Sequence, residues 1–222
     1  MISEIAFILD RSGSMESVRQ AAIDGFNAFL RDQQAAPGTV RLTLVLFDTE
    51  LLTIHDAVPV AEILPIDDDA FVPRGATALL DAIGDTIDRL ASRFASTPDD
   101  RKPGHVVVAI LTDGEENSSA RYTWKDIATR ISHQTEKYPW DFLFLGAGPD
   151  TIASAAKMSI AAHNSAQFSA DSTGQRAASA SISRKVEYSR VLKTGKATRE
   201  QIEEAAKPLQ DIVREEDDKR RG

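Results

Sequence analysis

The sequence contains no cysteine, which excludes disulfide bonds and metal sites built on thiolates. It also has no excess of basic residues, because 26 Lys and Arg stand against 34 Asp and Glu, a formal net charge of −8. Nucleic-acid backbones are bound by concentrated positive charge, so this balance argues against a nucleic-acid partner. No apolar run approaches the roughly 18 residues of a membrane span, and Glu4 interrupts any leader pattern. We therefore expect a cytoplasmic protein without a membrane partner.

The residues that are present have an ordinary globular balance, with 42% hydrophobic and 27% charged side chains. A chain of 222 residues suits one domain with an appendage. Short apolar runs alternate with helical patterns, which predicts an α/β fold with an open, mostly parallel, six-stranded sheet and helices on both faces. One strand, over 51–58, follows a hairpin turn and is predicted to be antiparallel. The other predicted strands are 5–9, 41–47, 106–111, 140–145 and 164–168, and the predicted helices are 15–34, 80–94, 124–137, 150–158 and 171–192.

The first polar cluster follows directly on the apolar run 5–9. Asp10, Ser12 and Ser14 place one carboxylate and two hydroxyls on alternate residues, and Gly13 between them allows a sharp turn. Open α/β folds bind their ligands where strands end and helices begin. This stretch is therefore a candidate site, and we expect Asp10 to lie at an exposed loop end.

Two later stretches stand in equivalent places. Thr77 opens the helical pattern of 80–94, and Asp113 comes directly after the wholly apolar strand 106–111. Each has an ordinary alternative explanation, since threonine is a common helix N-cap and aspartate before glycine is a common turn. The succession of three such places in order is a stronger signal than any one of them.

The three stretches together resemble the metal-ion-dependent adhesion site of von Willebrand factor type A domains. Asp-x-Ser-x-Ser at 10–14, Thr-x-Leu-x-Asp-Ala at 77–82 and Thr-Asp-Gly at 112–114 match its three loops. The resemblance covers roughly residues 1–192 and is that of a bacterial, intracellular, stand-alone member. It implies a Rossmann-like sheet and metal ligands at Asp10, Ser12, Ser14, Thr77 and Asp113.

The chemistry of these ligands agrees with that implication. Hard oxygen donors without His or Cys suit Mg²⁺, with Mn²⁺ or Ca²⁺ as alternatives. Neutral hydroxyls leave the ion short of negative charge, and in the family an Asp or Glu of a partner protein completes its coordination. The resemblance thus implies a non-catalytic adaptor, of a kind that also works in assemblies containing AAA+ ATPases.

Three other interpretations compete with this one. Asp10 could be the nucleophile of an Mg²⁺-dependent phosphatase or phosphotransferase, but such enzymes usually have a second acid where Ser12 stands. Gly146 and Gly148 could begin a nucleotide site, although the third glycine of that motif is missing. The metal site could also be intact but idle.

Several flanking residues have open roles. Asp48 is a turn acid or a support for the site, Glu115, Glu116 and Asn117 either border the site or are simply solvated, and Arg11 and Arg74 either guide an acidic partner or are ordinary surface residues. Residues 193–222 are highly charged, and Thr198 with Gln201 predicts a capping box that opens a helix interrupted at Pro208. We expect this segment to be a charged helical tail that is solvated and partly disordered, with a docking element for a partner protein as the alternative.

Overall fold

The computed structural model describes residues 2–138 and 140–222 and contains one six-stranded sheet in the order β3-β2-β1-β4-β5-β6. Neighbouring strands are parallel except for β2 and β3, which form an antiparallel hairpin. This confirms the predicted α/β class and the single antiparallel strand. The strands are β1 (Ile2–Asp10), β2 (Thr39–Phe47), β3 (Leu51–Pro59), β4 (His105–Thr112), β5 (Trp140–Gly146) and β6 (Ser165–Gln167).

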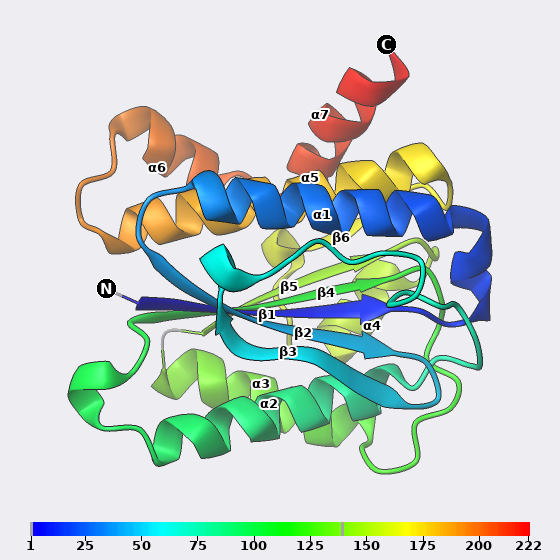
Figure 1. Ribbon diagram of the computed structural model, residues 1–222, viewed down its shortest axis with the longest axis horizontal. Coiled ribbons are helices and arrows are strands. Elements are labelled where there is room, and N and C mark those ends of the chain that lie inside the picture. The colour runs from blue at the N-terminus through cyan, green and yellow to red at the C-terminus, as the bar shows by residue number, and fades with distance from the viewer. Residues whose placement is uncertain (1, 139) are drawn as a thin grey trace.

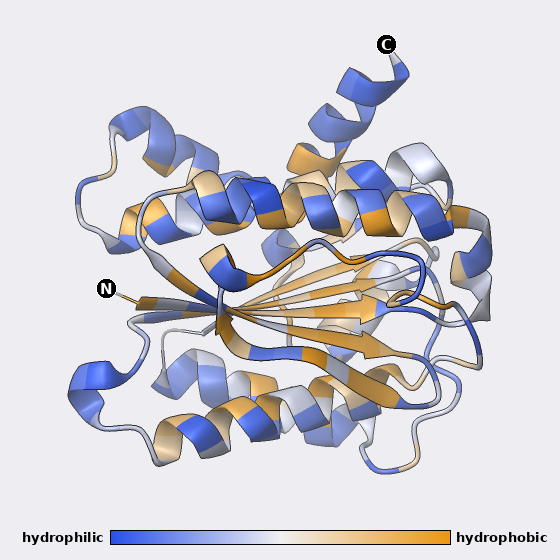
Figure 2. Cartoon of the chain, in the orientation of Figure 1, coloured by the Kyte–Doolittle hydropathy of each residue, from blue (hydrophilic) through white to orange (hydrophobic). Residues whose placement is uncertain are grey.

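Helices cover both faces of the sheet, as Figure 1 shows. One face carries α1 (Arg19–Ala35) and α5 (Ser172–Lys193), and the other carries α2 (Leu79–Ala95), α3 (Trp124–Lys137) and α4 (Thr151–Lys157). The β1 side chains alternate between the two cores: Phe7 packs under α1, while Ile8 packs under α2. Both are fully buried, which explains why residues 5–9 of β1 are all apolar. In Figure 2 the middle parts of the central strands are accordingly coloured as hydrophobic.

The first helix differs from its prediction at the start. Residues Gly13–Val18 form a 3₁₀ helix, and α1 proper begins at Arg19 rather than at Met15. The Met15 N–H donates to the Ser12 carbonyl oxygen at 3.0 Å, a tight turn that keeps the polar residues close to the end of β1. Apolar periodicity does not distinguish a 3₁₀ turn from an α-helical turn, so it predicts the start of α1 too early in the sequence.

The charged C-terminal segment forms two helices. Residues Arg199–Ala206 form α6 and Leu209–Arg221 form α7, and the capping box of Thr198 and Gln201 is present as predicted. Leu209 and Ile212 are fully buried, and Lys185 of α5 donates to the carbonyl oxygens of Ala205 in α6 and of Lys207 just after it, at 2.7 Å each. The far end of α7 projects from the body in Figure 1. A few apolar residues at one end of this helix therefore suffice to attach it to the domain core.

Candidate metal centre

Three loops meet at the edge of the sheet where β1 and β4 end. The Gly13 N–H donates to the Gly75 carbonyl oxygen at 3.2 Å, which joins the first loop to the second. The Asn117 N–H donates to the Thr77 carbonyl oxygen at 3.1 Å, which joins the second loop to the third. Segments far apart in the sequence are thus fixed to one another by their own backbones.

The five predicted ligands converge between these loops. Ser12 Oγ lies 3.1 Å from Ser14 Oγ, and Ser14 Oγ donates to Asp113 Oδ1 at 2.7 Å. Asp10 Oδ1 accepts the Ser12 backbone N–H at 2.7 Å. Thr77 reaches the same place, because a Cβ at position 114 would stand 2.9 Å from Thr77 Oγ1 and 3.7 Å from Asp10 Oδ2. Glycine at 114 therefore allows the threonine and the aspartate to approach each other.

The cluster has a buried floor and one accessible side. Asp10 is 0% exposed, whereas Ser14 is exposed and Asp113 is half-buried. The expectation that Asp10 lies at an exposed loop end is therefore wrong. The carboxylate belongs to the last residue of the central strand β1, with neighbouring strands on both sides.

Burial makes both carboxylates costly as anions. It raises the pKa of Asp10 from 3.8 to about 6, even though hydrogen bonds from Thr112 and Ser12 act in the opposite direction. Burial also raises the pKa of Asp113, while the hydrogen bond from Ser14 lowers it. A divalent cation among these oxygens would offset that cost, because it supplies the missing positive charge.

Thr77 is not a helix cap. It stands two residues before α2, whose N-terminus has no side-chain cap from Ala78. The residue is only 3% exposed, and its hydroxyl is not among the fully buried, unpartnered atoms of residues 2–138 and 140–222, so the oxygen can reach the cluster. A hydroxyl oxygen in that place is a ready ligand, so the ordinary explanation for this threonine no longer applies.

No protein-family model and no curated protein sequence matches the chain. Solved structures are similar in fold. A von Willebrand factor type A structure from Catenulispora acidiphila matches with a TM-score of 0.54 and 16% identity, over 83% of this chain and 42% of that one. The chain has the von Willebrand factor type A fold.

Two further structures share this fold with the chain. Proximal thread matrix protein 1 from the mussel byssus has a TM-score of 0.55 and 15% identity, over 82% of this chain and 45% of that one. A variant of the PilB minor pilin from Streptococcus sanguinis has a TM-score of 0.56 and 11% identity, over 89% and 64%. The chain spans less than two thirds of the length of each of these proteins.

No helix within 2–138 or 140–222 is long and apolar enough to cross a membrane. In the same residues, no group of three or more His, Cys, Asp or Glu is placed to hold a metal ion. The von Willebrand-type cluster contains two carboxylates and three hydroxyls, so a metal there depends on hydroxyl ligands.

Asp48 is a buried support beneath the loops rather than a plain turn acid. Its Oδ2 lies 3.0 Å from Nε of Arg11 and 3.0 Å from Nε of Arg74. Arg11 is only 5% exposed, so it is neither a surface residue nor free to attract a partner. The two arginines instead join the first and second loops of the von Willebrand-type site through one carboxylate.

The acidic third loop also has a supporting role. Glu116 accepts the Leu80 N–H at 2.9 Å, and Asn117 accepts the Thr77 N–H at 2.9 Å, both through side-chain oxygens. Asp81 in turn accepts three backbone N–H groups, those of 120–122, at 3.0 Å each. Glu116 and Asn117 are therefore engaged in holding the start of α2, whereas Glu115 is exposed and makes no such contact within the described residues.

Sequence reasoning missed Thr112 as a member of the site. Its hydroxyl lies 2.5 Å from Asp10 Oδ2 and 3.1 Å from the Gly114 carbonyl oxygen. The signal was a threonine at the last position of an otherwise aliphatic strand, one residue before Asp113. The turn at Gly146 serves packing, because a Cβ there would stand 2.5 Å from Thr151 Oγ1.

Proposed function

We propose that the chain is a non-catalytic, divalent-metal-dependent protein-binding module. The observation that carries this proposal is the convergence of Asp10, Ser12, Ser14, Thr77 and Asp113 from three loops on one spot with a single accessible side. In this proposal the five residues hold Mg²⁺, and an Asp or Glu of a partner protein reaches the ion from the side of Ser14 and Asp113.

The donor set supports a hard cation. Every side chain of the cluster offers oxygen, and few short ligands leave coordination positions for water and for one outside group. One structure of the mussel byssus protein, at 15% identity, holds zinc in its metal-ion-dependent adhesion motif. Mn²⁺ and Ca²⁺ are alternatives to Mg²⁺ for the same reason of ligand chemistry.

The bound ion would attract a carboxylate of the partner, and the five residues of this chain would hold the ion in place. Asp10 and Asp113 contribute the two negative charges that balance a divalent cation. The neutral hydroxyls of Ser12, Ser14 and Thr77 add ligands without adding charge. The ion therefore keeps an affinity for one further anion, which four carboxylate ligands would abolish.

The burial of Asp10 favours this proposal over phosphoryl-transfer chemistry. A nucleophile must reach the phosphorus atom of its substrate, and the Asp10 side chain is fully covered and hydrogen bonded on both oxygens. The similarity of the three loops to stand-alone bacterial members extends the proposal to a cytoplasmic adaptor, including in assemblies with AAA+ ATPases.

Titration calorimetry with Mg²⁺ tests the metal site. Asp113→Ala should lose metal binding with little change in stability, because this side chain is half-buried and accepts one side-chain hydrogen bond. Ser17→Ala is the matched control, since its exposed hydroxyl donates to the Ser14 carbonyl oxygen at 3.3 Å and is not a predicted ligand. Undiminished Mg²⁺ affinity in Asp113→Ala would refute the assignment.

Partner capture from the source cell, with Mg²⁺ and then with chelator, tests the role of the metal. Thr77→Ala should weaken partner binding more than metal binding, because in this mechanism the hydroxyl ligates the ion most tightly once a partner acid is bound. A partner that stays bound in chelator would instead support a metal site without function.

A further inference from the structure

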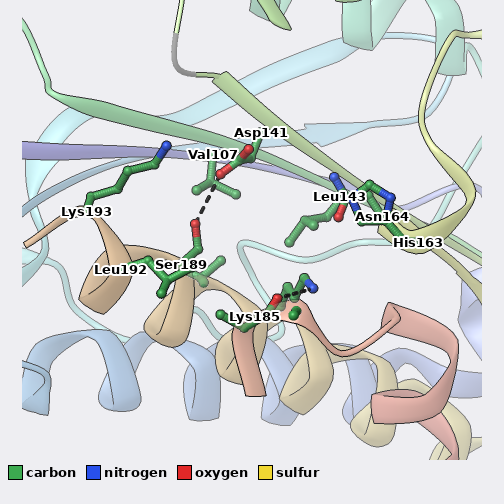
Figure 3. A pocket seen from close by; sticks show the side chains of 12 residues that line it. Val107, Asp141, Leu143, His163, Asn164, Lys185, Ser189, Leu192 and Lys193 are labelled. Atoms are coloured by element: carbon green, nitrogen blue, oxygen red, sulfur yellow. Dashed lines mark hydrogen bonds between the residues drawn. The ribbon is translucent and has the colours of Figure 1, made fainter. Parts of the chain in front are cut away.

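One cavity of about 420 Å³ lies between α5, α6 and the start of β4 and β5. Its buried polar walls are already engaged, as Figure 3 shows for Ser189, which donates to Asp141 at 3.1 Å. Lys185 donates to the carbonyl oxygens of Ala205 and Lys207. These groups hold α5 and α6 in place, so they are not free to receive a ligand.

A second cavity of about 300 Å³ differs in this respect. It lies on the opposite face of the sheet, where α2 and α3 end and where β4 and β5 begin. Aromatic rings form much of its wall, since Phe94 meets Trp140 edge-on at 5.8 Å and His133 meets Tyr138 at 5.9 Å. Its volume is at the lower end of the range for small-molecule sites, which suits a ligand of one or two rings.

Two mostly buried residues add polar groups to this cavity. Gln134 is 7% exposed and Trp140 is 4% exposed, and both line it. Neither the Gln134 amide nor the Trp140 indole N–H belongs to the fully buried, unpartnered atoms of the described residues. Both groups can therefore exchange a water for a ligand in the cavity.

A cation stands at the mouth of the same cavity. Lys102 lines it, and its only ion pair within the described residues is with Asp99 at 2.7 Å, whose side chain is 96% exposed. Such surface pairs are weak, so the ammonium is free to turn to a bound anion.

We propose that this cavity binds a small aromatic carboxylate. The aromatic walls would stack on or meet the edge of a ring. The Lys102 ammonium, the Gln134 amide and the Trp140 indole N–H are all donors, and a carboxylate is an acceptor with two oxygens. This combination distinguishes the cavity from a purely apolar groove, which would bind neutral and charged rings alike.

The site is independent of the proposed metal centre. Val106, near the start of β4, lines the cavity, whereas Thr112 at the end of the same strand contacts Asp10. Six residues of strand separate the two, a distance of about 20 Å. The aromatic carboxylate would therefore bind at the edge of the sheet opposite the metal loops.

Nuclear magnetic resonance of the full ¹⁵N-labelled chain tests this proposal, because the two tryptophan indole N–H signals are separate reporters. Benzoate and phenylacetate at millimolar concentration should shift the Trp140 signal and leave that of Trp124, which lies beside Lys157, in place. Benzyl alcohol has the aromatic ring but no carboxylate, so it tests the role of the ligand's charge. Cyclohexanecarboxylate has the carboxylate but no aromatic ring, so it tests the role of the ring. Both should bind at least fivefold more weakly than benzoate.

Three variants test whether benzoate binds in this cavity. Lys102→Met should weaken benzoate about fivefold or more, whereas Arg101→Met, which removes a neighbouring cation that does not line the cavity, should leave the affinity within twofold. Ala91→Leu, which fills the cavity, should abolish the shift, with its circular dichroism spectrum as the check on folding. The proposal is overturned if Trp140 does not respond to benzoate, if benzyl alcohol binds equally well, or if Ala91→Leu still binds.

Discussion

Replacing the buried Asp10 by asparagine separates the free-energy cost of burying its charge from the contribution of that charge to Mg²⁺ binding. Asn has the shape of Asp, so its carbonyl oxygen can accept the Ser12 N–H and its amide can donate to Thr112 Oγ1. The Thr112 hydroxyl then donates to the Gly114 carbonyl oxygen, 3.1 Å away. No buried hydrogen-bonding group is lost, and one buried charge is removed.

The magnitude follows from the pKa of Asp10, which burial raises from 3.8 to about 6. The folded chain holds this proton more tightly than the unfolded chain, so the free energy of unfolding falls as the pH rises through that interval. A difference of about two in pKa corresponds to about 3 kcal/mol. In chelator at about pH 8, we expect Asp10→Asn to be more stable than the parent chain by about 1 to 3 kcal/mol.

Magnesium should remove most of this stability difference or reverse it. An ion at 100 times its dissociation constant stabilises the folded parent by about 2.7 kcal/mol, and a variant without the site gains nothing. Urea denaturation with chelator and with Mg²⁺ measures both effects, and repeating it at about pH 5 should shrink the difference in chelator because Asp10 is then largely protonated. The reasoning is refuted if Asp10→Asn is the less stable chain in chelator, or if Mg²⁺ stabilises both chains equally.

Three further changes test other parts of the structure. Burial raises the pKa of Glu4 from 4.5 to about 7 against the opposing charge of Arg93, so stability should fall by about 3 kcal/mol as the pH rises through that interval, and Glu4→Gln should remove this slope in urea titrations; an unchanged slope would contradict it. Gly114→Ala should weaken Mg²⁺ binding more than it lowers stability, because its Cβ would stand 2.9 Å from Thr77 Oγ1; calorimetry with undiminished affinity would oppose this. Leu209→Ala should cost about 2 to 5 kcal/mol in urea denaturation, since that side chain is fully buried; a loss within about 0.5 kcal/mol, typical of surface positions, would show that α7 does not belong to the core.

The sheet could be predicted because its signal is local. Strands such as 5–9 and 106–111 are buried on both faces, so each reads as an unbroken apolar run, and the structure extends them by only a few residues. The order of loops along the chain then placed Asp10, Thr77 and Asp113 at one edge of a parallel sheet. The strand positions follow from the pattern of neighbouring residues. The meeting of the three loops follows from that pattern together with the handedness of the connections between parallel strands.

The supports of the site could not be predicted in this way. Glu116, Asn117 and Asp81 act on backbone groups 36 to 41 residues away in the sequence. Nothing in the pattern of an acidic loop separates a carboxylate that holds a helix start from one that faces water. The packing of α7 is equally hard to predict, because three buried apolar residues at one end of this charged helix attach it to the domain.

These supports bear on how the site would work. The loops are tied to one another by the Gly13 to Gly75 and Asn117 to Thr77 backbone bonds and by Asp48 between two arginines, none of which involves a metal. The oxygens therefore stand near one another before any ion arrives, and ion binding has little loop entropy to overcome. The ligand oxygens nevertheless form hydrogen bonds among themselves, as in Ser14 to Asp113, and a cation must replace these bonds. The affinity for the ion then depends on the exchange of these hydrogen bonds for metal–oxygen contacts, while the loops stay in place. A partner's carboxylate would bind to loops whose positions are already fixed.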